Sequence, residues 1–412
     1  MAARSWLLVV HAGAGEHSTA AERERIYCNA MRTACVAGRE ALLHGGDAMR
    51  ACVAAVAAME DDPACNAGLG SNLTEDGTVE CDASVMDGSV ATFGACGAVS
   101  GVRNPVRLAE ALLVRQGSGE RLLGRVHPMV LAGWGARTWA QTHGVHVVEP
   151  ASLVTPHAKA SWRQYMKWLR EEEEEEASSS AAGEAADLGQ GVSPKRRRLD
   201  VQSSSTPPVD SVAAAGGVNS SLLNDTVGAV CCDGLHCAAA VSSGGVWLKH
   251  SGRVGEAAAF GAGCWASDGS QGDGDGVNGG GGVSVAASVS GVGEQVMRSL
   301  LAQAACNVLR ASQDWDDVGA MLTPTAAADG RRESGPSAGI IALRCGEAGA
   351  AEGGSAASRP RIELIVAHSA PSFAVGYAHH QQPTPTAFIS RRAPGSVSAS
   401  GPTSVFATLI SQ

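Results

Sequence analysis

The sequence is poor in aromatic and charged residues and has no long apolar run. Of its 412 residues, 4% are aromatic and 17% are charged, whereas 44% are hydrophobic and 52 are glycines. No apolar stretch reaches the roughly 18 residues that span a bilayer. The N-terminal segment MAARSWLLVV is also too short in its apolar part for a secretory signal. We therefore expect an intracellular protein without membrane contact, whose core is built from small residues.

Two further classes of protein are disfavoured by what is missing. The formal net charge of −10 opposes broad nucleic-acid binding, because neutralising phosphates needs a basic surface. The twelve cysteines include no Cys-x-x-Cys pair, and no histidine cluster completes a zinc set. The sequence therefore predicts a reduced protein with no metal, no cofactor and no nucleic-acid partner.

Two blocks of ordered sequence flank a long segment of low complexity. The first block extends to about residue 155 and opens with an expected strand at 6–10, followed by a glycine-rich turn at 11–15. Asp47 is the expected N-cap of a helix at 48–60. The other expected elements are helices at 20–43, 105–115 and after 294, and strands at 78–83, 92–100, 229–233, 237–242, 246–249, 283–289, 339–344 and 362–368.

The segment 156–224 is predicted to be a mostly disordered linker. A short amphipathic helix at 162–170 runs into six glutamates at 171–176, and Ser/Ala/Gly-rich sequence follows. Low hydrophobicity with charge blocks of opposite sign predicts disorder. The basic run Lys195-Arg196-Arg197-Arg198 is either an ordinary solvated run or a nuclear localisation signal that an import receptor can reach. We expect the protein in nucleus and cytoplasm.

Thr226 stands where this linker meets an apolar strand. The hydroxyl of a threonine inside a chain is a poor nucleophile, because no base lies beside it by default. If the bond Asp225–Thr226 were cut, the new α-amine, with a reference pKa of about 7.7–8, would lie within reach of the Thr226 Oγ. The plain alternative is that Thr226 only begins a strand, where a β-branched residue is favourable.

Several motifs in a fixed order decide between these alternatives. They are 11–15, 60–62, 66–72 and 80–88 in the first block, and 226–230, 238–245, 249–255 and 290–294 in the second. Together they resemble the N-terminal nucleophile hydrolases of the type 2 asparaginase family over about residues 7–155 and 224–300. The resemblance implies an α+β fold, the four-layer αββα sandwich. It also implies self-cleavage into an α subunit, 1–225, and a β subunit, 226–412, which form one domain and pair as a dimer of αβ heterodimers.

The closer resemblance is to the threonine aspartases, or taspases, the protease branch of this family. Ser242-Ser243 stands where asparaginases usually carry Thr at the second position, and Lys249-His250 precedes the Gly-Arg-Val-Gly run. Gly263-Cys264-Trp265-Ala266 follows that run, and a long linker precedes the nucleophile. A self-cleaving enzyme presents its own scissile bond to its active site, so the Asp before Thr226 indicates its specificity.

The sequence thus predicts a self-processing threonine endopeptidase that cleaves Asp225–Thr226 and then protein substrates after Asp. Two alternatives stay open. The first is an isoaspartyl peptidase/L-asparaginase that acts on small β-aspartyl substrates. The second is a non-enzymatic nuclear scaffold built on a degenerate hydrolase.

The resemblance also implies a role for each site residue. Thr226 Oγ would attack the Asp225 carbonyl, the freed amine would act as base, and Ser243 would tune it through a hydrogen bond. Arg253 would grip the substrate carboxylate with its planar fork of donors. Asn66 would be the oxyanion donor, with Ser290 and Gly291 as a second oxyanion site, and Gly13, Gly15, Gly244 and Gly245 would let backbone approach the nucleophile and the substrate. Glu256 departs from the family, which places Asp there to hold the free α-amine of a small substrate.

Overall fold

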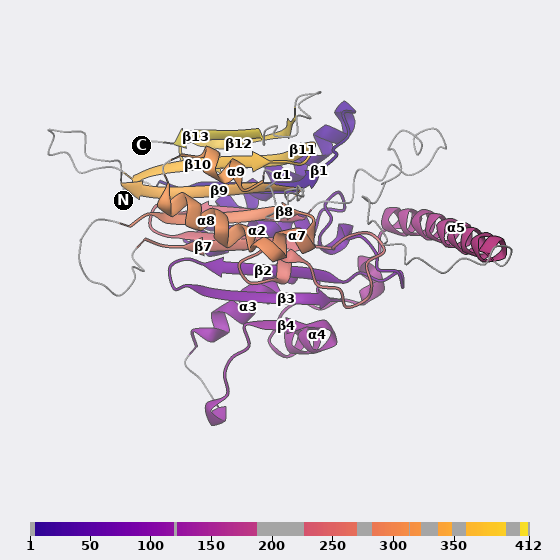
Figure 1. The fold of residues 1–412 in the computed structure, drawn as a ribbon. Helices are drawn as coiled ribbons and strands as arrows, with labels where there is room; N and C mark the ends of the chain where they lie inside the picture. The colour runs from indigo at the N-terminus through magenta and orange to yellow at the C-terminus, as the bar shows by residue number, and fades with distance from the viewer. Residues whose placement is uncertain are drawn as a thin grey trace, which may run out of the picture.

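The computed structural model describes residues 5–118, 122–187, 226–269, 282–312, 314–322, 337–347, 360–392 and 404–410. Within these ranges two β-sheets pack face to face, and helices cover the outer face of each (Figure 1). The predicted four-layer αββα sandwich is confirmed. None of the helices in these ranges is long and apolar enough to cross a membrane.

The strand that follows the expected cleavage point lies at the centre of the larger sheet. In spatial order its eight described strands are β12 (Gln382–Arg391), β11 (Ser372–His379), β1 (Leu7–Gly15), β5 (Val227–Cys232), β6 (Cys237–Ser243), β2 (Cys81–Asp87), β3 (Thr92–Val99) and β4 (Val130–Ala132). Strand β5 lies between β1 and β6, and Val227 pairs with Ala12 on one side and Ser242 on the other. The N-terminal end of β5 is therefore enclosed by both neighbours.

The smaller sheet covers the inner face of the larger one. Its described strands, in spatial order, are β13 (Ser404–Ile410), β10 (Pro360–His368), β9 (Ala338–Glu347), β8 (Ser284–Gly291) and β7 (Cys264–Ser267). Strands β8 and β9 pack against β5. Apolar side chains from both sheets, such as Val230, Val241, Ile341 and Leu343, fill the layer between them. Burial of this layer fixes one sheet against the other.

Helices with many small residues cover the two outer faces. On the larger sheet these are α1 (Ala21–Leu43), α2 (Ala48–Glu60) and α3 (Pro105–Gln116), and on the smaller sheet α8 (Leu301–Ala311) with its neighbours α7 (Gly293–Ser299) and α9 (Asp316–Ala320). Asp47 caps α2 as predicted, accepting a hydrogen bond of 2.8 Å from the Arg50 amide. A Cβ on Gly38 of α1 would lie 2.8 Å from the Ala51 carbonyl of α2. Such close approach is what the small-residue composition permits.

Three local predictions were wrong. Strand β1 continues through the expected turn at 11–15, with a bulge between His11 and Ala14, because its backbone pairs with β11 and β5 on both sides. The expected strand at 246–249 is not a strand, and only a single bridge joins Thr74 to Lys249 there. Strands β11, β12 and β13 were not anticipated at all. Their pairing partners lie in distant parts of the chain, which a local pattern does not reveal.

The amphipathic helix predicted at 162–170 lies within a longer helix, which occupies the beginning of the segment predicted to be mostly disordered. The segment α5 (Pro156–Asp187) runs through the glutamate run and extends away from the sandwich (Figure 1). Glu and Ala are strong helix formers, and an ion pair of 3.5 Å joins Lys167 to Glu171 one turn later. Residues 188–225, which include the basic run Lys195–Arg198 and Asp225, lie outside the described residues.

Candidate active site

Thr226 lies directly before β5 and is only 5% exposed. Its Oγ1 is 2.8 Å from the Glu256 Oε1 and 3.1 Å from the Ser243 Oγ. A threonine hydroxyl has one proton to donate, and a carboxylate is the stronger acceptor. The hydroxyl of Thr226 therefore donates to Glu256 in preference to Ser243.

Ser243, the last residue of β6, lies on the other side of the Thr226 hydroxyl. Its Oγ accepts a hydrogen bond of 3.0 Å from the Gly245 amide. A hydroxyl oxygen has two lone pairs, so the Ser243 Oγ can also accept the hydrogen bond of 3.1 Å from the Thr226 hydroxyl. The Gly245 amide, the hydroxyls of Ser243 and Thr226 and the Glu256 carboxyl group are thus joined by hydrogen bonds. These contacts bring together four of the sequence-predicted residues.

Asn66 is buried beside the Gly244–Gly245 turn. Its Nδ2 donates to the Gly245 carbonyl at 2.9 Å, and its Oδ1 accepts from the Asn72 amide at 2.9 Å. The Gly244 amide in turn donates to the Asn66 carbonyl at 2.8 Å. A Cβ on Gly244 would collide with the Asn66 Oδ1 and would lie 2.6 Å from the Ser71 Cβ. Glycine at 244 is therefore what lets these two loops meet.

Arg253 and Glu256 project into the same region, beside the N-terminus of α7. A Cβ on Gly293 would lie 2.8 Å from the Arg253 Nη2 and 2.6 Å from the Glu256 Oε2. The guanidinium also has a partner that we had not assigned a role: its Nη2 and Nε lie 2.8 and 3.0 Å from the Glu294 Oε1. Glu294 belongs to the 290–294 motif, which also contains the predicted site residues Ser290 and Gly291. Its place in that motif is the sequence signal that could have identified it as a site residue.

Asp82, on β2, anchors the segment that carries Arg253 and Glu256. Its Oδ2 accepts from the Gly255 amide at 2.8 Å and its Oδ1 from the Ala98 amide at 2.7 Å. Lys249 is buried under the glycine turn, where its Nζ donates to the Glu80 carbonyl at 2.8 Å. A Cβ on Gly245 would lie 2.8 Å from the Lys249 Cδ. Both side chains therefore act on the site by fixing its backbone.

The remaining predicted residues lie on β1, which pairs with β5, and on β8, which packs against it. The Ser290 Oγ accepts from the Ala14 amide at 3.0 Å, so it holds the end of β1 where Gly13 and Gly15 lie. Gly13 has a φ of 95°, which favours glycine. Gly291 ends β8 and pairs with Ala338. Thus Ser290 and Gly291 on β8 lie beside the end of β1 that carries Gly13 and Gly15.

Burial shifts the protonation of two groups that contact Thr226. It raises the pKa of Glu256, an effect that the Thr226 hydrogen bond and the Arg253 charge partly oppose. It lowers the pKa of His11 to about 3, although contact with the Thr226 backbone acts in the other direction. His11 is therefore a neutral imidazole, whose Nε2 is 3.0 Å from the Ser288 Oγ. Sequence reasoning assigned it no role.

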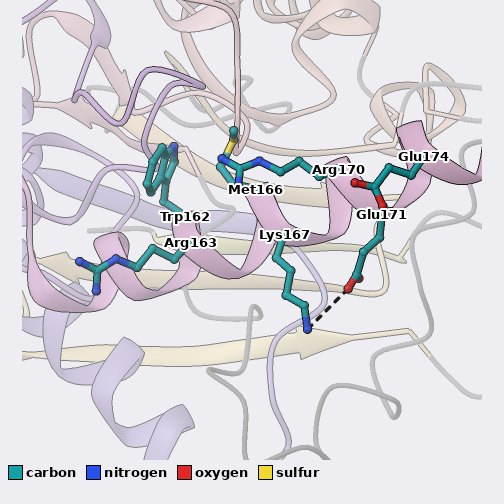
Figure 2. Close-up of a pocket in the computed structure, with 7 residues that line it drawn as sticks. All are labelled: Trp162, Arg163, Met166, Lys167, Arg170, Glu171 and Glu174. Atoms are coloured by element: carbon teal, nitrogen blue, oxygen red, sulfur yellow. Dashed lines mark ion pairs between the residues drawn. The ribbon is translucent and has the colours of Figure 1, made fainter. Parts of the chain in front are cut away.

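A cavity of about 320 Å³ lies elsewhere, along α5. Figure 2 shows the described residues that line it, all of which lie on α5: Trp162, Arg163, Met166, Lys167, Arg170, Glu171 and Glu174. It contains none of the residues that surround Thr226. In the part of the chain that the structure describes, no group of three His, Cys, Asp or Glu side chains could hold a metal ion. All twelve cysteines are buried and free.

Comparison with known proteins gives one family. The family model described as Asparaginase (Asparaginase_2) matches residues 4–357. A plant-type L-asparaginase of Pyrobaculum calidifontis is 34% identical over 74% of this chain and 81% of its own length. Another from Thermococcus kodakarensis is 31% identical over 74% of this chain and 80% of its own. The isoaspartyl peptidase/L-asparaginase of Xenopus laevis is 30% identical over 72% and 74%.

Proposed function

Because this chain belongs to the asparaginase family of N-terminal nucleophile hydrolases, we propose that it is a self-processing threonine hydrolase. Thr226 is its nucleophile, and after the Asp225–Thr226 bond is cut, the α-amine of Thr226 is its base. We further propose that the mature enzyme is an endopeptidase of the taspase type that cuts protein substrates after Asp.

The observation that carries the proposal is the environment of one hydroxyl. Thr226 Oγ1 is buried at the start of a central strand, between a serine hydroxyl and a carboxyl group. Any buried hydroxyl needs a hydrogen-bond partner, but a threonine that merely begins a strand does not require a carboxyl group beside it. The proposal predicts two fragments in the purified protein, the second beginning with Thr226, and a single intact chain in Thr226→Ala. Intact mass spectrometry with N-terminal sequencing tests it, and an uncleaved wild-type chain would refute it.

Two observations support an Asp-specific endopeptidase. The bond to be cut in the chain itself has Asp on its acyl side, and Arg253 offers that side chain a guanidinium. Glu256 is buried, contacts the Thr226 hydroxyl and has a raised pKa. The contact with the Thr226 hydroxyl occupies one carboxyl oxygen of Glu256, which is then not available to hold the charged α-amine that distinguishes a small aspartyl substrate from a peptide.

A second candidate, an isoaspartyl peptidase/L-asparaginase, is favoured by the names of the relatives. Of the three similar proteins described above, two are named plant-type L-asparaginases and the third isoaspartyl peptidase/L-asparaginase. In that case Arg253 binds the free α-carboxylate of a small substrate and Glu256 binds its amine. On names alone this candidate has the better support, and our preference for the endopeptidase rests on the contact of Glu256 with the Thr226 hydroxyl and on the taspase-like motifs.

One competition experiment separates the two candidates. The processed enzyme is incubated in one tube with a peptide that contains an internal Asp–Gly bond and with a β-aspartyl dipeptide. Mass spectrometry follows both substrates, and Thr226→Ala is the matched inactive control. Cleavage of the peptide after Asp with the dipeptide intact supports the endopeptidase. Loss of the dipeptide alone refutes it and supports the second candidate.

Two expectations about partners belong to the same proposal. We propose that the αβ unit pairs into a dimer and that Lys195–Arg198 binds an import receptor, with nucleus and cytoplasm as its locations. Light scattering of the processed protein tests the dimer. Replacing the four basic residues by alanine and imaging a fluorescent fusion tests the import signal. An unchanged distribution of the fusion protein would show that the basic run is not an import signal.

A further inference from the structure

We propose that Glu256 is the general base of the self-cleavage step, taking the proton of the Thr226 hydroxyl as that oxygen attacks. This inference rests on the proposed function, because it concerns the reaction that creates the N-terminal threonine. It assigns Glu256 a role other than holding the amine of a substrate.

Self-cleavage needs a base that the mature enzyme does not need. After cleavage, the α-amine of Thr226 can accept the hydroxyl proton. In the intact chain that nitrogen is part of the peptide bond to Asp225, and an amide nitrogen is not a useful base. The first reaction of the protein must therefore use another group within hydrogen-bonding reach of the hydroxyl.

The geometry of the intact chain points to one such group. Glu256 Oε1 is 2.8 Å from Thr226 Oγ1, and Ser243 Oγ is 3.1 Å away. A serine hydroxyl is too weak a base, and Ser243 already accepts a hydrogen bond from the Gly245 amide. His11 contacts the backbone of Thr226 rather than its hydroxyl. Among the hydrogen-bond partners described for this hydroxyl, Glu256 is the one with the chemistry of a base.

The surroundings of Glu256 suit it to this task. The side chain is 3% exposed, and burial raises its pKa, which strengthens it as a base. The charged groups that face it are Arg253 on its own loop, which opposes this effect, Asp82 on β2, which adds to it, and Glu294 on α7, which pairs with Arg253. Asp82 also binds the Gly255 amide and so fixes the loop that carries Glu256.

The atoms of the reaction balance with these groups and water alone. The Thr226 hydroxyl transfers its proton to the Glu256 carboxylate while Oγ bonds to the Asp225 carbonyl carbon. The carbon–nitrogen bond then breaks, and the proton on Glu256 passes to the leaving nitrogen, which becomes the Thr226 amine. Water hydrolyses the resulting ester: its hydroxyl goes to the Asp225 carbonyl carbon and its proton to Thr226 Oγ.

The test compares the self-cleavage rates of the full chain and of Glu256→Gln, a substitution that keeps the shape and removes the base. Precursor is made by cell-free synthesis and followed by intact mass over a pH series. Glu149→Gln, an exposed glutamate in the same chain, is the control and should cleave like wild type. We expect Glu256→Gln to be about 10² to 10⁴ times slower. The wild-type rate should rise as pH passes the raised pKa of Glu256, and the variant should lose that rise.

The possible outcomes separate a failure of this inference from a failure of the proposed function. If Glu256→Gln cleaves at the wild-type rate with the wild-type pH dependence, Glu256 is not the base, but the proposed function stands. If the cleavage rate rises with pH at the ordinary pKa of an aspartate, and this rise persists in Glu256→Gln, the base is Asp225. That result also overturns the inference. If the variant does not fold, as thermal unfolding would show, the wild-type profile decides: a rate independent of pH between 4 and 9 refutes a carboxylate base. A wild-type chain that never cleaves refutes the proposed function itself.

Discussion

The contact between Gly244 and the Asn66 loop provides a sharp test of how the site is assembled. In Gly244→Ala the new Cβ would collide with the Asn66 Oδ1 and would lie 2.6 and 2.8 Å from the Cβ and Oγ of Ser71. Contact at van der Waals distance needs a shift of about 1 Å. Asn66 is held by the Asn72 amide and the Gly245 carbonyl and does not move independently.

The expected cost follows from this geometry. Overpacking of this kind destabilises by about 1–3 kcal/mol, so Tm should fall by a few degrees. A misplacement of about 1 Å in a catalytic group costs about 10²-fold in rate. Because the displaced residue is the expected oxyanion donor, we predict that self-cleavage of Gly244→Ala slows about 100-fold while the protein remains folded at 25 °C.

The assay is the time course of precursor loss by intact mass, together with a thermal unfolding scan. Gly135→Ala is the matched control, since Gly135 lies in α4 (Gly133–Thr142) and a Cβ there meets nothing within 4 Å. It should gain about 0.5–1 kcal/mol of stability and process normally. Wild-type processing by Gly244→Ala would show that Asn66 is not held as described or does not serve the reaction.

Three further predictions follow from single contacts. Arg253→Lys should lower kcat/KM for Asp-containing substrates about 10- to 100-fold by steady-state kinetics, because an ammonium lacks the planar fork; unchanged kinetics would remove Arg253 from carboxylate binding. Ser243→Ala should slow self-cleavage about 10-fold or more, since it removes a hydrogen-bond partner of the Thr226 hydroxyl, and a normal time course would contradict this. Burial raises the pKa of Glu60 from 4.5 to about 8, so folding favours its protonated form and wild-type stability should fall as pH rises across that window, by at most about 1.4 kcal/mol per pH unit. Glu60→Gln should lack this slope in urea unfolding, and parallel slopes would refute the assignment.

The local features of the fold were predictable where the signal lies within a few neighbouring residues. Asp47 before an Ala-rich run marks the start of α2, and the predicted and observed ends of α1 and α2 agree within one residue. The strand after Thr226 was equally clear. The full length of helix α5 was not, because beyond residue 170 the glutamate run and the Ser/Ala-rich sequence suggested a solvated chain, whereas Glu and Ala together propagate a helix.

The composition and motif order of the sequence determined the sandwich and the candidate nucleophile, Thr226. Only the tertiary structure decided which groups surround its hydroxyl. Glu256 reaches it across 30 residues of sequence and Glu294 pairs with Arg253 across 41, and neither contact follows from a local pattern. Side-chain direction at these positions depends on how the two sheets and α7 pack, and on Asp82 holding the intervening loop. A residue's type states what chemistry it can do, whereas its neighbours, brought together by the fold, determine which chemistry it does.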